Sequence, residues 1–369
     1  MTLSGIIGHA GAVRALQHAL EADQIAGTYL FTGPEGVGKT TLALAFAKAA
    51  ACLDPSRSPF DACGVCESCR RVASASQPEI VIIPPAGDQT QIWQFWDRDG
   101  KPGGKLENTL IHSPVIGRKR VFIIEKAETL TIPAANSLLK VLEEPPSYAV
   151  FLLLATHPAR MLPTILSRSM ILRLTPAPLR ELADHLQRVL NISREQAMLF
   201  SAYAEGRVGT AYRLASNPKA FETMDDLASF TFQSAKLSPL EMFKYAERIR
   251  KKAATSKALL SPEGDVAEDE ADEPSSKEKV GRTQIGTLLE LMGLCYRDLM
   301  AAAIQGEEAE LIFINHRDEI LRLSSGRSPE GWRKSLDLIL KARRSLDRNV
   351  SVPLLMDWLS VKLTCQNRR

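Results

Sequence analysis

Apolar residues recur with two different periods along the chain, and the change between them divides it into two parts. In the first part, short runs that are apolar almost throughout predict five strands, at 28–32, 79–84, 120–125, 149–155 and 169–174. Helical stretches such as 10–22 and 40–50 separate these runs. Apolar strands that alternate with helices are typical of a parallel sheet with helices on both faces, so we expect an α/β domain.

Beyond residue 175 only helical periods remain. They predict helices at 178–190, from a capping box of Ser193 and Gln196 up to Gly206, at 207–216, and onward to the C-terminus. The segment 261–279 interrupts them. It is acidic, lacks aromatic residues and contains two prolines, which favours a disordered surface loop over a DNA mimic or a binding site for a basic partner.

Composition narrows the class of protein. The 369 residues are 45% hydrophobic and 24% charged, with a net charge of +3, which is typical of globular domains and excludes bulk disorder. The longest apolar run, 149–155, is far shorter than the roughly 18 residues of a membrane span. No basic residue precedes an apolar stretch at the N-terminus, so we expect a cytoplasmic protein without a membrane partner.

The strongest motif is GPEGVGKT at 33–40, which matches the phosphate-binding P-loop at Gly33, Gly38, Lys39 and Thr40. It follows a predicted strand and opens a predicted helix, as the motif requires. Glycines let backbone N–H groups surround the β-phosphate, Lys39 reaches the phosphate oxygens, and Thr40 can bind Mg²⁺. We therefore expect ATP or ADP with Mg²⁺ as a cofactor.

A P-loop ATPase also needs an acidic residue near the metal and a group that orients water. Glu125 stands at the end of a predicted strand, where the acid is expected, but Lys126 follows it where a base is expected. A protonated lysine has no acceptor for a proton from water. The sequence therefore predicts a site that binds nucleotide but lacks a residue suited to activate water for hydrolysis. Whether the chain is itself an enzyme stays open.

Four cysteines, Cys52, Cys63, Cys66 and Cys69, have the spacing C-x10-C-x2-C-x2-C. Closely spaced pairs of this kind bring thiolates to one centre, and Gly64 relieves the tight turn between two of them. Four sulfur ligands favour structural zinc, because catalytic zinc keeps one position open. Free thiols in an insertion are the alternative interpretation.

Several strings besides the P-loop resemble the AAA+ clamp-loader subunits of bacterial DNA polymerase III. They are the four-cysteine insert, VFIIEKAE, AANSLLKVLEEPP, LLLATHPARMLPTILSRS and the closing NVSVPLLMDWLSVKL. The resemblance is strong from Ile7 to about Pro176 and weaker beyond. A generic P-loop ATPase has no reason to carry AANSLLKVLEEPP, so this string is the most specific of them.

The resemblance implies three domains and a fuller nucleotide site. The domains are an AAA+ P-loop domain with a parallel sheet over 1–175, with its zinc module at 52–69, a helical lid over 176–217 and an all-α collar over 218–369. The collar contains the acidic loop 261–279 and mediates assembly of a five-membered ring. Residues Gly36, Thr41 and Thr156 join the nucleotide site, the last as a sensor of the nucleotide.

Arg168 lies in the serine–arginine string that the resemblance marks out, and we expect it at the domain surface after a short helical turn. It either forms an ion pair within its own domain or reaches a phosphate on another subunit, because guanidinium binds phosphate through two parallel hydrogen bonds. The resemblance implies the second role, an arginine finger acting in trans.

Two subunit types share this pattern, the ATPase motor gamma/tau and delta-prime. The motor has Asp–Glu where this chain has Glu125–Lys126, and it has a sensor arginine where this chain has Gly209. These differences favour a delta-prime-type component of the DNA-directed DNA polymerase complex, which helps load the sliding clamp onto primed DNA during replication. Its expected partners are gamma/tau and delta in a heteropentamer, the clamp and DNA. An active gamma/tau-type ATPase is the alternative, and a stand-alone P-loop ATPase fits the strings poorly.

The stretch 86–113 departs from the family pattern because it is longer and rich in glycine. Its tryptophans, Trp93 and Trp96, either stack on DNA bases or anchor the loop on the domain. Anchoring is the favoured interpretation.

Overall fold

The computed structural model describes residues 2–54, 60–74, 78–97, 104–235, 274–346, 348 and 350–366. The chain separates into two compact units: Met1–Pro178 with Arg207–Gly209, and Leu179–Gly206 with Thr210–Arg369. The first unit is α/β and the second is helical, which confirms the predicted fold class. The division of the helical part into a lid and a collar stays a prediction.

The five predicted strands all form, and they make one parallel sheet in the order β2-β3-β4-β1-β5. Their bounds are β1 (Thr28–Thr32), β2 (Ile80–Ile83), β3 (Arg120–Ile124), β4 (Ala149–Ala155) and β5 (Met170–Arg173). In the register of the central strands, Thr32 at the end of β1 pairs with Ala155 at the end of β4. The residues that follow these two strands therefore start from the same edge of the sheet.

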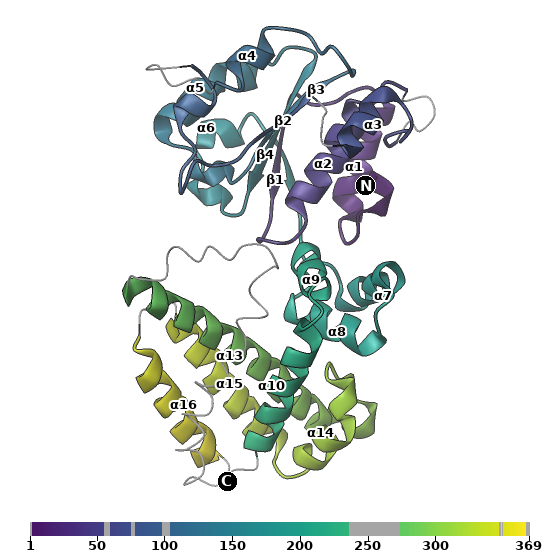
Figure 1. Ribbon diagram of the computed structural model, residues 1–369. Coiled ribbons are helices and arrows are strands. Elements are labelled where there is room, and N and C mark those ends of the chain that lie inside the picture. The colour runs from purple at the N-terminus through teal and green to yellow at the C-terminus, as the bar shows by residue number, and fades with distance from the viewer. Residues whose placement is uncertain are drawn as a thin grey trace. The chain divides into compact units, whose positions relative to one another are not determined.

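Helices cover both faces of the sheet (Figure 1). On one face are α1 (Ala10–Glu21), α2 (Lys39–Ala50) and α3 (Glu67–Ala73), and on the other are α4 (Glu107–Leu110), α5 (Ile132–Glu143) and α6 (Pro163–Leu166). Successive strand residues point to opposite faces. Phe31 and Ile123 accordingly pack with α2, whereas Leu30 and Phe122 pack with α5. This double burial explains why the strands are apolar throughout.

The unusual loop after β2 is tied to the sheet by a buried ion pair. Arg120, at the start of β3, donates from Nε to Glu79 Oε2 at 2.6 Å, and both side chains are almost fully buried. The other oxygen of Glu79 accepts the N–H of Val115 at 2.8 Å. Trp96 also fixes the loop, since its Nε1 donates to Ser137 Oγ on α5 at 3.0 Å. The anchoring interpretation is confirmed for this tryptophan.

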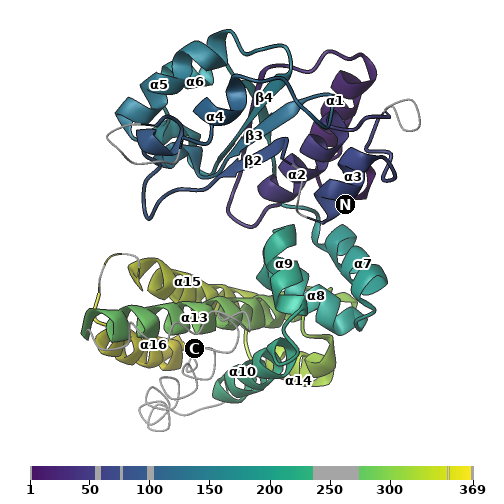
Figure 2. The ribbon, with the colours of Figure 1, turned by 45° about the horizontal axis from the view of Figure 1, so that its top comes forward.

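The described residues of the second unit form mainly helices. They are α7 (Leu179–Leu190), α8 (Arg194–Tyr203), the part of α9 (Val208–Ala215) from Thr210 onward, α10 (Ala220–Ser234), α13 (Pro274–Gln305), α14 (Arg317–Ser324), α15 (Pro329–Leu346) and α16 (Val352–Gln366). The helix α13 packs against α15, α10 and α14, and α15 packs against α16 (Figure 2). The capping box of Ser193 and Gln196 opens α8 as predicted.

The predicted acidic loop 261–279 lies mostly outside the described residues. Its last six residues differ from the prediction, because 274–279 form the first turns of α13. Pro274 suits that position, since the first helical residue needs no N–H donor. Within the described part of the chain, no helix combines the length and the apolar character needed to cross a membrane.

Candidate nucleotide site and cysteine cluster

The P-loop lies between β1 and α2 and borders a cavity of about 400 Å³. Gly33 N donates to the carbonyl of Ala155 at 3.2 Å, which ties the start of the loop to the end of β4. The cavity is lined by Glu35, Gly36, Gly38, Lys39, Thr40, Thr41, Glu125, Lys126, Glu128, Leu154, Thr156, His157 and Gly209. Every nucleotide-site residue predicted from the sequence is in this lining except Gly33, whose carbonyl contacts Lys39.

The ammonium of Lys39 is shared among three oxygens at the cavity. Its Nζ donates to the carbonyls of Gly33 at 2.7 Å and Pro34 at 2.9 Å, and to Thr156 Oγ1 at 3.2 Å. Thr156 follows β4, so the contact joins the P-loop to the neighbouring strand. Burial lowers the pKa of Lys39, and the negative charge of Glu128 opposes that shift. A phosphate entering the cavity would replace the carbonyl contacts.

Three charged side chains follow β3 and line the cavity. Glu125 is half-buried directly after the strand, and Lys126 is exposed with a left-handed backbone (φ 46°). The third, Glu128, was not singled out from the sequence. Its Oε1 accepts the N–H of Thr156 at 2.9 Å, and its Oε2 is buried with no hydrogen-bond partner among the described residues. Glu128 ends the string VFIIEKAE, three residues after Glu125, and this position could have marked it as a candidate site residue.

Two contacts support the P-loop from outside the motif. Gly209 N donates to the carbonyl of Gly36 at 2.8 Å, and a Cβ at position 209 would lie 3.1 Å from that oxygen. Gly209 stands where the resemblance places a sensor arginine, and its backbone instead packs closely against that of Gly36. On the other side, the buried His9 has its Nε2 3.0 Å from the carbonyl of Val37. Nothing in the sequence pattern indicated the contact of His9.

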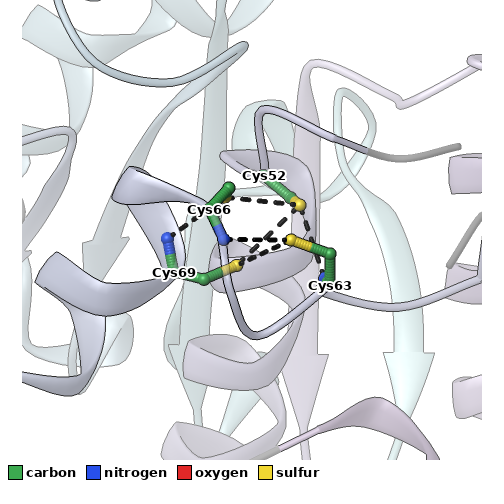
Figure 3. Close-up of side chains that lie close together, drawn as sticks. All are labelled: Cys52, Cys63, Cys66 and Cys69. Atoms are coloured by element: carbon green, nitrogen blue, oxygen red, sulfur yellow. Dashed lines mark hydrogen bonds between the residues drawn. The ribbon is translucent and has the colours of Figure 1, made fainter. Parts of the chain in front are cut away.

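The four predicted cysteines converge (Figure 3). Cys52 follows α2, Cys63 lies in the next loop, and Cys66 and Cys69 begin α3. All four sulfur atoms lie within 4.8 Å of one another. The sulfur of Cys52 is 3.8 Å from those of Cys66 and Cys69. A tetrahedral ion with sulfur bonds of about 2.3 Å requires sulfur separations of roughly 3.8 Å, so the cluster fits such an ion.

The backbone around the cluster is arranged for thiolates. The N–H groups of Cys63, Cys66 and Cys69 point to the sulfurs of Cys52, Cys63 and Cys66, at 3.3 to 3.4 Å. Gly64 has φ +76°, which confirms the tight turn predicted there. Burial raises the pKa of the Cys52 thiol. Burial also acts on Cys66, but hydrogen bonds from the backbone and from the neighbouring thiols of Cys69 and Cys63 together outweigh it and lower the pKa to about 6. Metal ligation requires thiolates, and N–H···S contacts stabilise them.

Arg168 follows α6, at the surface, as predicted. Its side chain is 33% exposed and forms an ion pair with Glu143 at the end of α5. It is absent from the described residues that line the P-loop cavity of its own chain. The sequence left two roles open for Arg168, an ion pair within its own domain and a contact with a phosphate on another subunit. The structure contains the ion pair.

Comparisons with known proteins point to one family. Residues 8–178 match the family described as DNA polymerase III, delta subunit. DNA polymerase III subunit delta′ of Bacillus subtilis is 28% identical over 95% of this chain and 94% of its own length. Subunit tau/gamma of Haemophilus influenzae is 32% identical over 51% of this chain, which spans only 26% of that relative. A solved gamma-subunit-related protein of Thermotoga maritima covers 96% of this chain and 99% of its own, with a TM-score of 0.42 and 18% identity, a likeness too low to inform function.

Proposed function

Because the chain is similar to clamp-loader subunits of DNA polymerase III, we propose that it is a delta-prime-type subunit that helps load the sliding clamp onto primed DNA. Its partners would be gamma/tau and delta subunits in a heteropentamer, working in the cytoplasm with the replication machinery. The delta′ relative supports this assignment over the motor, because the similarity to it extends through both units. The similarity to the tau/gamma relative covers about half of the chain.

The P-loop cavity would bind ATP or ADP with Mg²⁺. The N-terminus of α2 would offer positive potential to phosphate, Lys39 would contact its oxygens, and Thr40 and Glu125 stand where the metal shell is expected. Lys126 supplies no proton acceptor for water. We therefore propose nucleotide binding with little or no hydrolysis by this chain alone.

The position of Arg168 is the observation that supports its proposed role as an arginine finger in the assembly. Its guanidinium is partly exposed, and among the described residues it does not border the cavity of its own P-loop. It would therefore act on the nucleotide of a neighbouring subunit, where its fixed positive charge stabilises the γ-phosphate in the transition state. Such an arginine finger contributes about 10³ to 10⁵ in rate at its own site.

The test is the ATPase rate of reconstituted clamp-loader complexes in the presence of clamp and primed DNA. We expect Arg168→Ala to lower the rate by removing one finger, with assembly intact. Arg168→Lys should fail almost as badly, because an ammonium cannot make the planar two-pronged contact. Arg14→Ala, which removes an exposed arginine of α1, is the matched control. An unchanged rate with Arg168→Ala in a fully assembled complex would overturn the proposal.

We further propose that the cysteine cluster binds structural zinc. The four sulfurs would fill a tetrahedral coordination shell, so no position would be left for water or substrate, and the ion would secure the segment between α2 and α3.

A further inference from the structure

Glu128 occupies an unusual position at the nucleotide cavity. It lies on the single turn η4 (Ala127–Thr129) after β3, and its carboxylate reaches across to β4, where Oε1 accepts the N–H of Thr156 at 2.9 Å. Within the described part of the chain, Oε2 is buried and has no hydrogen-bond partner. Burying a carboxylate oxygen that has no hydrogen-bond partner is costly, so its retention needs a reason.

The reason lies in the chain of contacts that leads from Glu128 to the phosphate-binding lysine. Thr156, held through its N–H by Glu128, accepts through its hydroxyl from Lys39 Nζ at 3.2 Å. Lys39 is partly buried, which disfavours its charge, and the charge of Glu128 opposes this effect. The carboxylate thus acts on Lys39 both through Thr156 and directly through space.

We propose that Glu128 is a positioning residue of the nucleotide site: one oxygen holds Thr156 in place, and the negative charge keeps the Lys39 ammonium beside Thr156 for phosphate. The inference rests on the proposed binding of nucleotide. A bound phosphate would take the place of the carbonyls of Gly33 and Pro34 at Lys39, and the hydroxyl of Thr156 would remain available to it.

A purely structural role for Glu128 and the proposed positioning role predict different results for the variant Glu128→Gln. If the side chain only accepts the N–H of Thr156, an uncharged glutamine serves equally well, because its amide oxygen is an acceptor in the same place. If the charge matters, its removal lowers the pKa of Lys39. The other charged groups facing the cavity, Glu35, Glu125, Lys126 and His157, remain the same in both cases.

The experiment measures the affinity of the full-length chain for Mg²⁺–ADP by calorimetry between pH 7 and pH 10. Binding weakens at high pH, as Lys39 loses its proton. In Glu128→Gln we expect this loss to begin at lower pH, because the negative charge of Glu128 opposes the effect of burial on the pKa of Lys39. Glu21→Gln removes an exposed carboxylate at the end of α1 and should match the wild type.

Glu128→Asp separates the two contributions. Aspartate keeps the charge but is one methylene shorter, so it should retain the wild-type pH dependence while binding ADP more weakly, through the loss of the contact with Thr156. Identical pH profiles for the wild type and Glu128→Gln would overturn the inference, whatever the melting temperatures of the two proteins. So would a Glu128→Asp profile that matches Glu128→Gln.

Failure of this inference differs from failure of the proposed function. A wild-type chain that binds no Mg²⁺–ADP at all would overturn the nucleotide site and the role of Glu128 together. The finger role of Arg168 would be unaffected, because it is measured on the nucleotide of another subunit.

Discussion

Arg168 is bound to Glu143 of its own chain, with the guanidinium Nε 2.7 Å from the carboxylate Oε1 and Nη2 contacting the same oxygen. Its Nη1 also donates to the carbonyl of Thr164 at 3.0 Å. Both partners of the ion pair are partly exposed. A finger that reaches a neighbouring phosphate would exchange Glu143 for a more strongly charged acceptor.

The exposed position of this pair predicts a small effect on stability. We expect Glu143→Gln and Arg168→Ala each to change the free energy of unfolding by less than about 1 kcal/mol, as is usual for solvent-screened ion pairs. Urea denaturation of the isolated chain measures this. In the reconstituted complex the two variants should differ, with Arg168→Ala lowering the ATPase rate far more than Glu143→Gln. Equal losses would mean that the arginine acts only as the partner of Glu143.

The cysteine cluster predicts close to one zinc ion per chain in protein purified without chelator. Cys66→Ser should lose most of the metal and melt at a lower temperature, because metal binding is coupled to local folding. Mass-spectrometric metal analysis and thermal denaturation are the measurements. Cys295→Ala, in the second unit, should retain the zinc. Full occupancy in Cys66→Ser would contradict the assignment of four thiolate ligands.

The P-loop predicts binding of ATP or ADP that depends on Lys39. Lys39→Ala should abolish binding, because no other side chain contacts both the loop carbonyls and Thr156 among the described residues. The isolated wild-type chain should show no turnover above background, since Lys126 cannot accept a proton from water. Calorimetry and a phosphate-release assay test the two parts. Turnover that disappears in Lys39→Ala would favour the motor-type alternative.

The buried pair of Glu79 and Arg120 predicts a large loss of stability when one partner is removed. Glu79→Gln leaves the guanidinium without its carboxylate, and breaking a buried pair costs about 3–5 kcal/mol. Glu330→Gln breaks an exposed pair with Arg333 and should leave the free energy of unfolding almost unchanged, because solvent screens the pair. Urea denaturation of both variants measures the contrast. Similar small losses would mean that the loop after β2 does not depend on this ion pair.

Local patterns in the sequence were sufficient for the strands, the P-loop and the cysteine site. The strands are apolar throughout because both faces of the sheet are buried, and that pattern is readable without knowing the partners. The P-loop and the cysteine cluster each lie within one short segment, so residue type and spacing alone define them. The capping box of Ser193 and Gln196 is local in the same way.

The tertiary structure alone decided which distant residues complete the site. Thr156 is 117 residues from the lysine it contacts and 28 residues from Glu128. These residues meet because parallel strands in register bring the ends of β1, β3 and β4 to one edge of the sheet. The same holds for Arg168 and Glu143, which are 25 residues apart. The periodicity of a sequence determines which residues are buried, but the order and register of the strands determine which side chains meet.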